Sequence, residues 1–244
     1  MSSAGPLDVP WGDYLPDLWD GLLRTVGFTA VSFVGAVILG LAVALLRLGR
    51  VRPTRILAAA YTELFKNVPL LAIIFVTYFG LASAGLRLGV FEAGCLSLVL
   101  FYAAYLSEIF RSAIKGVHHG QQEAASALGL GRIATFGHVI LPQAVRIALP
   151  GTNTMLVDLL KSTSLLVTIS AAELMSQGRL IASATFRALE VYIVIAVIYF
   201  ALCYPLSQLL LWLERLIHAG VPLTPRRRRR VKMARALLAA GSPS

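Results

Sequence analysis

The sequence predicts an all-α integral membrane protein with five transmembrane helices, the N-terminus outside, and a cytoplasmic helix between the third and fourth spans. Of its 244 residues, 57% are apolar and only 14% are charged, whereas a soluble domain carries roughly 25% charged residues. The apolar residues also fall in runs of the length that a bilayer requires, about 20 residues per helix. These two observations exclude an ordinary soluble protein.

The five expected spans differ in character. The first is rich in glycine and alanine, small residues that let helices approach closely in lipid. The second is interrupted by Pro69, which cannot continue a regular helix. The expected spans are approximately Leu22–Leu46, Arg55–Leu81, Val90–Ile114, Val139–Ile169 and Val191–Leu213.

Basic residues set the orientation, because cytoplasmic loops retain lysine and arginine. They gather after the first span, after the third and in the tail, while the first twenty residues contain four acids and no base. We therefore expect an external segment at 1–20, a transmembrane domain at 21–216 and a basic cytoplasmic tail at 217–244. The run Arg226–Arg230 in that tail is interpreted as a contact with anionic lipid. The connection after the fourth span, with Glu173, Arg179 and Glu190, is predicted to be an external loop.

The segment between the third and fourth spans contains a predicted surface helix. Gln121 to Leu128 are good helix formers, and Gly129 and Gly131 are expected to end the helix. Glu123 lies in the first turn, where a negative charge suits the helix dipole. A short, ordered cytoplasmic helix is therefore expected here.

The same segment resembles a known motif. Glu123-Ala124-Ala125, Gly129 after three more residues, and Val139-Ile140-Leu141-Pro142 after nine more are similar to the EAA loop of ATP-binding-cassette importer permeases. Val139, in place of isoleucine, is the one departure from that pattern. The resemblance implies that this loop forms a coupling helix, which docks on a cytoplasmic ATPase subunit through Glu123, Ala124, Ala125 and Gly129.

Three further segments narrow the resemblance to the polar amino-acid branch of these permeases. Tyr61–Leu71 is similar to E-x-F-R-G-T-P-L-L, Tyr105–Ser112 to Y-x-A-E-I-x-R-G, and Lys161–Leu165 to K-D-T-S-L with Ser162 in place of aspartate. The resemblance implies a subunit of the bacterial inner membrane that pairs with an identical or homologous permease. An external solute-binding protein would deliver an amino acid, and cytoplasmic subunits would bind ATP.

Charged residues within the spans are candidates for the transport path, because a charge in the bilayer costs about 2.5 kcal/mol or more. A zwitterionic amino acid needs a base for its carboxylate and an acid for its ammonium. Lys161 is the predicted base, Glu108 or Asp158 the acid, and Thr163 and Ser164 add hydroxyl groups. The alternatives are a local Asp158–Lys161 ion pair and a pairing of Glu108 with Arg111. Glu63 and Lys66 line the path or extend to the membrane surface.

Other functions fit the sequence less well. An ion-coupled secondary transporter or a channel subunit is the alternative, but such carriers are usually built from internal repeats, which are not evident. We find no nucleotide-binding or hydrolase motif, so the chain is expected to be no enzyme and to hold no cofactor or metal. His118 and His119 are interpreted as solvated loop residues, and Cys95 and Cys203 as packing residues.

Overall fold

The computed structural model describes residues 10–219, and every regular element in that range is helical. Two π-helical turns and one 3-10 helix interrupt the α-helices. In chain order the elements are α1 (Trp11–Leu48), α2 (Arg52–Asn67), α3 (Leu70–Phe75), a π-helix (Val76–Gly80), α4 (Leu81–Ser83), α5 (Val90–Gly116), α6 (His119–Ala127), α7 (Arg132–Thr135), a π-helix (Phe136–Ile140), α8 (Leu141–Ser162), a 3-10 helix (Thr163–Ile169), α9 (Leu174–Thr185) and α10 (Ala188–Ala219).

The predicted number of spans is confirmed for the described residues. Four helical runs are long and apolar enough to cross a membrane, namely Trp11–Leu48, Val90–Gly116, Arg132–Ile169 and Ala188–Ile217. The fifth is the pair of α2 with α3 and α4, bent by 108° at its break. Pro69 follows this break, and Val68 is extended with φ −97° and ψ 131°, the conformation that a following proline favours.

The ends of the helices differ from the expected spans. Helix α1 begins at Trp11 instead of Leu22 and so enters the segment that we expected to be external. Leu18 and Gly21 of these added turns are buried, and a Cβ atom at Gly21 would lie 3.1 Å from the Cα atom of Leu174 in α9. Packing on α9 thus extends the helix beyond the continuous apolar stretch.

Two further differences concern the fourth span and the connection after it. The helical run of the fourth span begins at Arg132 rather than Val139. The expected external loop contains α9, a helix of 12 residues with its own buried side chains. The run Arg226–Arg230 and most of the expected tail lie outside the described residues.

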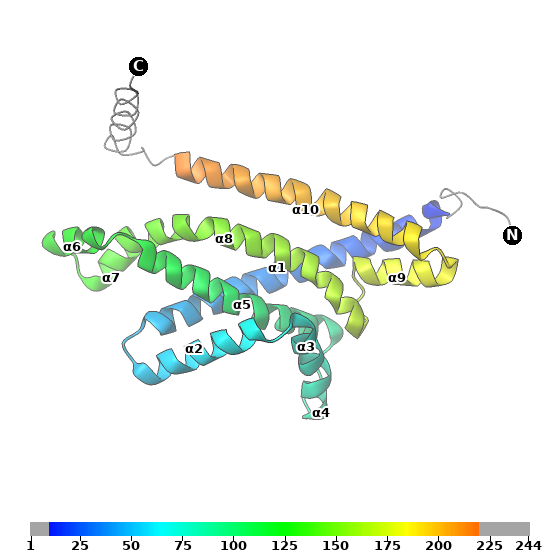
Figure 1. Cartoon of the computed structure of the whole chain (residues 1–244), viewed down its shortest axis with the longest axis horizontal. Helices are drawn as coiled ribbons and strands as arrows, with labels where there is room; N and C mark the ends of the chain where they lie inside the picture. Colours follow the sequence, from blue (N-terminus) through cyan, green and yellow to red (C-terminus); the bar gives the residue numbers. More distant parts are fainter. Residues whose placement is uncertain (1–9, 220–244) are drawn as a thin grey trace, which may run out of the picture.

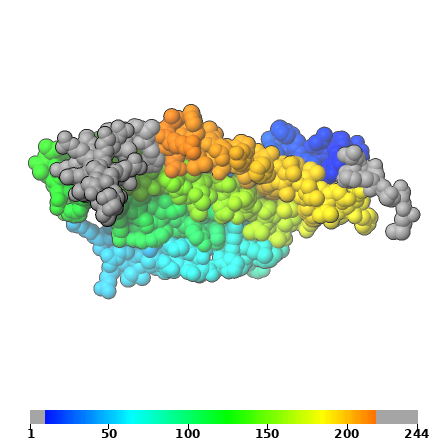
Figure 2. Space-filling view, turned by 45° about the horizontal axis from the view of Figure 1, so that its top comes forward, coloured from blue at the N-terminus to red at the C-terminus, as the bar shows by residue number. Residues whose placement is uncertain are grey.

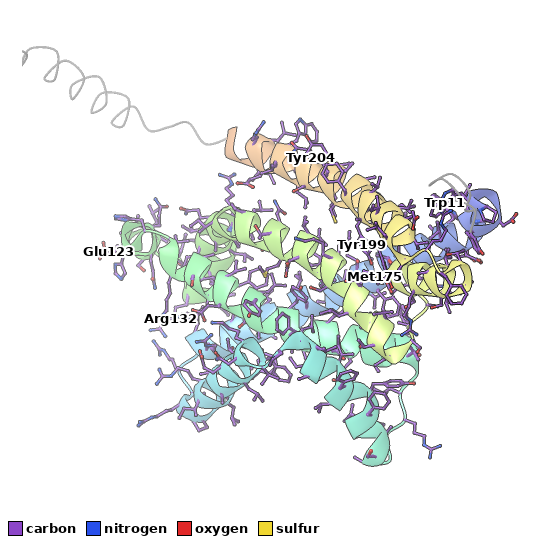
Figure 3. All side chains as sticks on the ribbon, turned by 45° about the vertical axis from the view of Figure 1, so that its right-hand side comes forward. Trp11, Glu123, Arg132, Met175, Tyr199 and Tyr204 are labelled. Atoms are coloured by element: carbon purple, nitrogen blue, oxygen red, sulfur yellow. The ribbon has the colours of Figure 1, made fainter. Side chains whose placement is uncertain are left out.

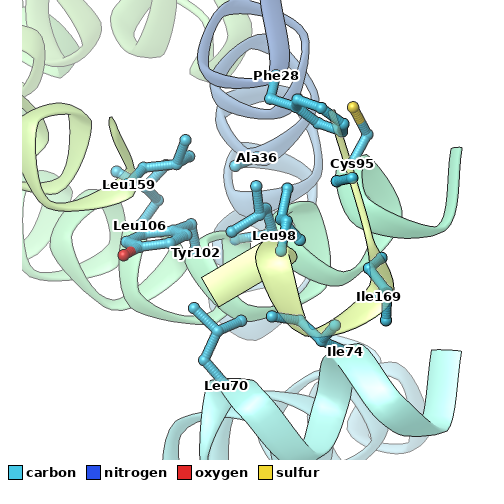
Figure 4. Close-up of a cluster of buried hydrophobic side chains, with 13 residues drawn as sticks. Phe28, Ala36, Leu70, Ile74, Cys95, Leu98, Tyr102, Leu106, Leu159 and Ile169 are labelled. Atoms are coloured by element: carbon cyan, nitrogen blue, oxygen red, sulfur yellow. The ribbon is translucent and has the colours of Figure 1, made fainter. Parts of the chain in front are cut away.

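The centre of the fold is the pair of α1 and α5, which lie side by side (Figure 1). A Cβ atom at Gly40 of α1 would lie 2.9 Å from Leu106 Cβ and 3.1 Å from the carbonyl oxygen of Ala103. Only glycine permits so close an approach, as the composition of the first span predicted. Figure 4 shows the core around Leu98 and Tyr102 of α5, with side chains from α1, α3 and α8 packed on it.

The molecule is elongated, and its two ends carry different elements. Helices α6 and α7 form one end, while α9 and the start of α1 form the other (Figure 1). In Figure 3, Glu123 marks the first end, and Trp11 and Met175 lie at the second. Helix α10 runs along the surface (Figure 2) with exposed apolar side chains such as Val197, Phe200 and Trp212. Such a surface suits a helix in contact with lipid or with another membrane chain.

Candidate functional site

The first candidate region is α6, which matches the predicted cytoplasmic helix with small changes at its ends. It begins at His119, and the Nδ1 atom of His118 accepts a hydrogen bond from Gly120 N at 3.1 Å. At the other end, Gly129 N donates to Ser126 O and Leu130 N donates to Ala125 O, each at 3.0 Å. This is a Schellman motif, which requires a left-handed residue after the helix.

Gly129 is that left-handed residue, with φ of +76°. Gly131 has φ of −66° and instead precedes α7 as its N-cap. Our expectation that both glycines end α6 was therefore half wrong, because a Schellman motif needs only one left-handed position. The sharp turn at Gly129 fixes how α6 projects from the rest of the chain.

The four predicted coupling residues occupy different places on α6. Glu123 points away from the molecule with 70% of its side chain exposed, and His119 Nδ1 lies 3.1 Å from its Oε1 atom. Ala124 is exposed as well, whereas Ala125 is buried. A partner protein can therefore touch Glu123 and Ala124 directly, while Ala125 holds α6 against its own chain and Gly129 shapes the turn.

A hollow lies beside α6, on the same end of the molecule. Arg50, which follows α1, and Arg132, which begins α7, line it together with Gln122, Ser126, Leu130, Thr135, Phe136 and Ile140. Two guanidinium groups from distant parts of the sequence thus border α6. They give this end a basic surface that suits acidic side chains of a partner.

The second candidate region is a polar cluster inside the fourth span. The Tyr102 hydroxyl of α5 lies 2.8 Å from Asp158 Oδ2 and 2.8 Å from Ser162 Oγ of α8. It donates to the carboxylate and accepts from the serine. Lys161 Nζ lies 3.9 Å from Asp158 Oδ1, which is beyond hydrogen-bond distance. The local ion pair that we considered is present, but it leaves both groups able to bind a ligand.

Asp158 and Lys161 also face open space. Their side chains are 50% and 57% exposed, respectively, although both residues belong to an apolar span. They line a hollow of about 580 Å³ between α8 and α10, together with Pro150, Asn153, Thr154, Met155, Val157, Ser207, Leu210, Leu211 and Glu214. An acid and a base therefore meet in one hollow within the membrane-spanning part.

The two predicted hydroxyl residues are the first two residues of the 3-10 helix. The Thr163 hydroxyl donates to Leu160 O at 2.7 Å and is fully buried. The Ser164 hydroxyl donates to Lys161 O at 2.7 Å and is more exposed. The change from α-helix to 3-10 helix at Thr163 agrees with the irregular backbone expected beyond Lys161. Neither residue is among those that line the hollow of Asp158 and Lys161, and Ser164 is the more accessible of the two.

Glu108 lies elsewhere, and its surroundings match the alternative that we left open. Its two carboxylate oxygens are hydrogen-bonded by Arg47 of α1 and Arg111 of α5. It follows Tyr102 by six residues on α5, about 9 Å along the axis. Two guanidinium groups occupy its carboxylate, so Glu108 links α1 to α5 and does not share the hollow of Asp158 and Lys161.

Glu63 and Lys66 lie at the bend between α2 and α3. Glu63 is exposed, and the Asn67 amide donates to the Glu63 carbonyl oxygen at 2.7 Å. The Tyr105 hydroxyl donates to the carbonyl oxygen of Lys66 at 3.2 Å. The bond from Tyr105 satisfies one of the last four carbonyl groups of α2, which have no partner within the helix. The bend is thus held in place from α5.

Sequence reasoning missed one buried acid. Glu173, predicted as part of a loop, is the N-cap of α9 and is 0% exposed. Its carboxylate accepts hydrogen bonds from Met175 N, Ser176 N, Ser176 Oγ and Tyr199 OH at 2.7 to 3.0 Å. An acid directly before an apolar periodic stretch is a helix-start signal, and it would have found this residue.

Comparisons with known proteins agree with this arrangement. The family described as binding-protein-dependent transport system inner membrane component matches residues 36–219. The probable glutamine ABC transporter permease protein GlnM of Bacillus subtilis (strain 168) is 38% identical over 196 residues, which is 80% of this chain and 91% of the relative. The glutamine transport system permease protein GlnP of Escherichia coli (strain K12) is 34% identical over 203 residues, 82% of this chain and 93% of that protein.

A solved structure, that of an amino acid ABC transporter with histidines, matches with a TM-score of 0.82 and 33% identity over 88% of this chain and 99% of that chain. The MetNI methionine ABC transporter, at 19% identity and a TM-score of 0.71, shares the fold.

The family match covers most of the chain and decides between the functional classes considered. It does not favour an ion-coupled secondary transporter or a channel subunit. In these transport systems the ATPase is a separate subunit, and a further permease component completes the assembly, so this subunit is not an enzyme. The family and the apolar helices indicate a multi-pass protein of the bacterial inner membrane. The chain belongs to the binding-protein-dependent transport system inner membrane component family, the permease subunits of ATP-binding-cassette importers.

Proposed function

We propose that this permease carries an amino acid, whose carboxylate binds Lys161 and whose ammonium binds Asp158. The observation that supports this proposal is the exposure of both charges to one hollow inside an apolar span. Charges at this depth are costly unless they meet water, a partner or a ligand. The names of the relatives, which refer to glutamine and to amino acids, point to the same class of substrate.

We assign to each remaining predicted residue a role that fits its surroundings. Ser164 adds a hydroxyl beside Lys161, whereas Thr163 shapes the 3-10 turn from a buried position. Glu108 stabilises the inner part of the α1–α5 pair through its two arginines. The acid that faces the substrate is therefore Asp158.

The coupling to ATP is proposed to run through α6 into α8. Glu123 and Ala124 contact the ATPase subunit, and the arginines of the neighbouring hollow face its acidic side chains. From α7 to α8 the helical run from Arg132 to Ser162 continues through a π-helical turn without a break. Movement of α6 thus reaches the helix that carries Asp158 and Lys161, and it shifts the hollow between outward and inward states.

The proposed assembly has two permease chains, identical or homologous, two ATPase subunits and an external solute-binding protein. The family description, which names a binding protein, supports this composition. The substrate enters from the outer end, near α9, and leaves at the end that carries α6.

Uptake by the purified assembly in ATP-loaded proteoliposomes tests the transport proposal. We expect labelled L-glutamine, L-arginine, L-glutamate or L-cystine to accumulate only with ATP, and ionophores that abolish ion gradients to leave this uptake unchanged. Lys161→Gln should raise the KM about tenfold or more, since a charged hydrogen bond contributes about 1.5–3 kcal/mol. Uptake that follows the ion gradient instead would refute the proposal.

A charge reversal tests the coupling role. Glu123→Arg should weaken binding of the ATPase subunit by about tenfold, which corresponds to roughly 1.4 kcal/mol, because it replaces the acid that contacts this subunit with a larger side chain of opposite charge. The matched control is Asp17→Arg, an exposed acid of α1 at the opposite end of the molecule. Equal ATPase binding by Glu123→Arg and the control would remove α6 from the coupling path.

A further inference from the structure

The segment that begins at Lys161 differs at one position from the K-D-T-S-L pattern that it resembles. The structure suggests which residue compensates for this difference. In the K-D-T-S-L pattern an acid follows the lysine, whereas here Ser162 follows Lys161. The nearest acid on α8 is Asp158, four residues earlier. Residues four apart lie on the same face of a helix, about 6 Å apart along its axis.

The Tyr102 hydroxyl shows that positions 158 and 162 share one environment. It lies at the same distance, 2.8 Å, from the Asp158 carboxylate and from the Ser162 hydroxyl. Tyr102 itself is buried in the core between α5 and α8 and cannot move toward either residue without repacking. An acid at either position would therefore meet the same phenol.

The position of Lys161 also favours position 158 for the acid. Its ammonium lies 3.9 Å from Asp158 Oδ1, so position 158 keeps the acid next to the base that receives the substrate carboxylate. The other acid that lines the hollow is Glu214 on α10. Within the described residues Lys161 forms its ion pair with Asp158, and none joins Lys161 to Glu214. Among the residues that line the hollow, Asp158 is the acid beside Lys161.

We propose that Asp158 supplies the substrate-binding acid of this permease, a carboxylate moved by one helical turn from position 162, and that Tyr102 is its positioning residue. The inference rests on the proposed function, because it assigns the substrate ammonium to this carboxylate. It also implies that the ammonium binds about 6 Å nearer the end that carries α6 than an acid at position 162 would place it.

A swap of the two side chains tests this proposal in the reconstituted assembly. The probe is whichever of labelled L-glutamine, L-arginine, L-glutamate and L-cystine the unmodified protein transports fastest. Asp158→Ser should raise the KM by roughly tenfold or more. The double variant Asp158→Ser with Ser162→Asp should recover most of the affinity, since the acid returns to the face shared with Tyr102.

Tyr102→Phe separates a binding role from a structural one. If Asp158 served only to accept the Tyr102 hydrogen bond, then Tyr102→Phe combined with Asp158→Ser would restore the KM. We expect no such rescue. Tyr102→Phe alone should raise the KM only moderately, because the carboxylate of Asp158 remains in place.

The outcomes are distinct. An unchanged KM in Asp158→Ser, a swap that recovers nothing, or a rescue by Tyr102→Phe overturns the role of Asp158. Failure of the unmodified assembly to transport any of the four amino acids overturns the proposed function instead.

Discussion

Two glutamates of this chain are held in opposite ways. Glu173, before α9, is fully buried, and four neutral N–H and O–H groups donate to it. Glu108, on α5, has 30% of its side chain exposed, and two arginines surround it. One acid therefore depends on fixed dipoles in a dry site, and the other on two cationic side chains at a site that water reaches in part.

This difference distinguishes a rigid contact between helices at Glu173 from a more adaptable contact at Glu108. Two of the four donors of Glu173 are backbone N–H groups at the start of α9, and Leu174 N donates to Thr25 Oγ1 of α1 at 3.1 Å. Glu173 also reaches Tyr199 of α10, so α1, α9 and α10 meet at one point near the outer end. Arginine side chains can follow a moving carboxylate, whereas backbone donors cannot. The contact at Glu173 is thus rigid, whereas Glu108 is held by side chains that can adapt, toward the end of the molecule where we propose that α6 moves.

The largest effect is expected from Glu173→Ala. The variant leaves two backbone N–H groups and two hydroxyls buried without their acceptor, at about 1–3 kcal/mol for each unsatisfied group. We expect the free energy of unfolding to fall by about 3 kcal/mol or more, measured by thermal unfolding in detergent. Glu108→Ala, the matched control, should cost about 1 kcal/mol, because water solvates the freed arginines. Equal losses of unfolding free energy in the two variants would contradict the distinction between the two acids.

The second prediction concerns pH. Glu173 lies between the fourth and fifth spans, and burial raises its pKa above the ordinary value of 4.5, although the backbone N–H groups of Met175 and Ser176 act in the opposite direction. The folded state then holds the proton more tightly than the unfolded state. Its stabilising contribution is complete below about pH 4.5 and is lost as the pH rises through the folded pKa.

Comparison with Glu173→Gln isolates this contribution, because glutamine does not titrate. The difference in unfolding free energy between the two proteins should shrink by about 1.4 kcal/mol for each unit by which the pKa is raised. Thermal unfolding from pH 4 to pH 8 measures it. A difference that grows with pH would show that the hydrogen bonds outweigh burial.

Removal of one donor should have an intermediate effect. Tyr199→Phe deletes the hydroxyl that lies 3.0 Å from Glu173 Oε2, while the remaining donors stay in place. We expect a loss of about 1 kcal/mol, the usual net contribution of one hydrogen bond. Tyr204→Phe on the same helix, whose side chain is exposed, should leave the midpoint of thermal unfolding unchanged. A loss in both variants would indicate a general effect on α10.

The same two acids show what the sequence could predict. The spans, the break at Pro69 and the helix around Glu123 follow from apolar runs, proline and glycine, which act locally and leave a clear pattern. The partners of Glu108 were considered only within its own helix, as Arg111, because Arg47 lies 61 residues away. Glu173 appeared to be a loop charge, since its burial depends on α1 and α10, which meet it only in the folded chain.

The hollow between α8 and α10 could be predicted only in part, because some of its neighbours are distant in the sequence. Asp158 and Lys161 are three residues apart on one helix, so their proximity was visible in the sequence. Their shared partner Tyr102 and the wall formed by α10 come from other spans. Whether Glu108 or Asp158 faces the hollow was left open, since a hydropathy pattern does not show how helices are rotated relative to one another.

The smallest effect is expected for the Arg47–Glu108 pair. A double-mutant cycle with Arg47→Leu and Glu108→Gln isolates the coupling between these two side chains. We expect about 0.5 kcal/mol, as for other partly exposed ion pairs, because Arg111 remains on the carboxylate and water reaches both groups. Chemical denaturation of the four proteins measures it. A coupling of several kcal/mol would mean that Glu108 is held as rigidly as Glu173. The proposed contrast between the rigid contact at Glu173 and the adaptable contact at Glu108 would then be wrong.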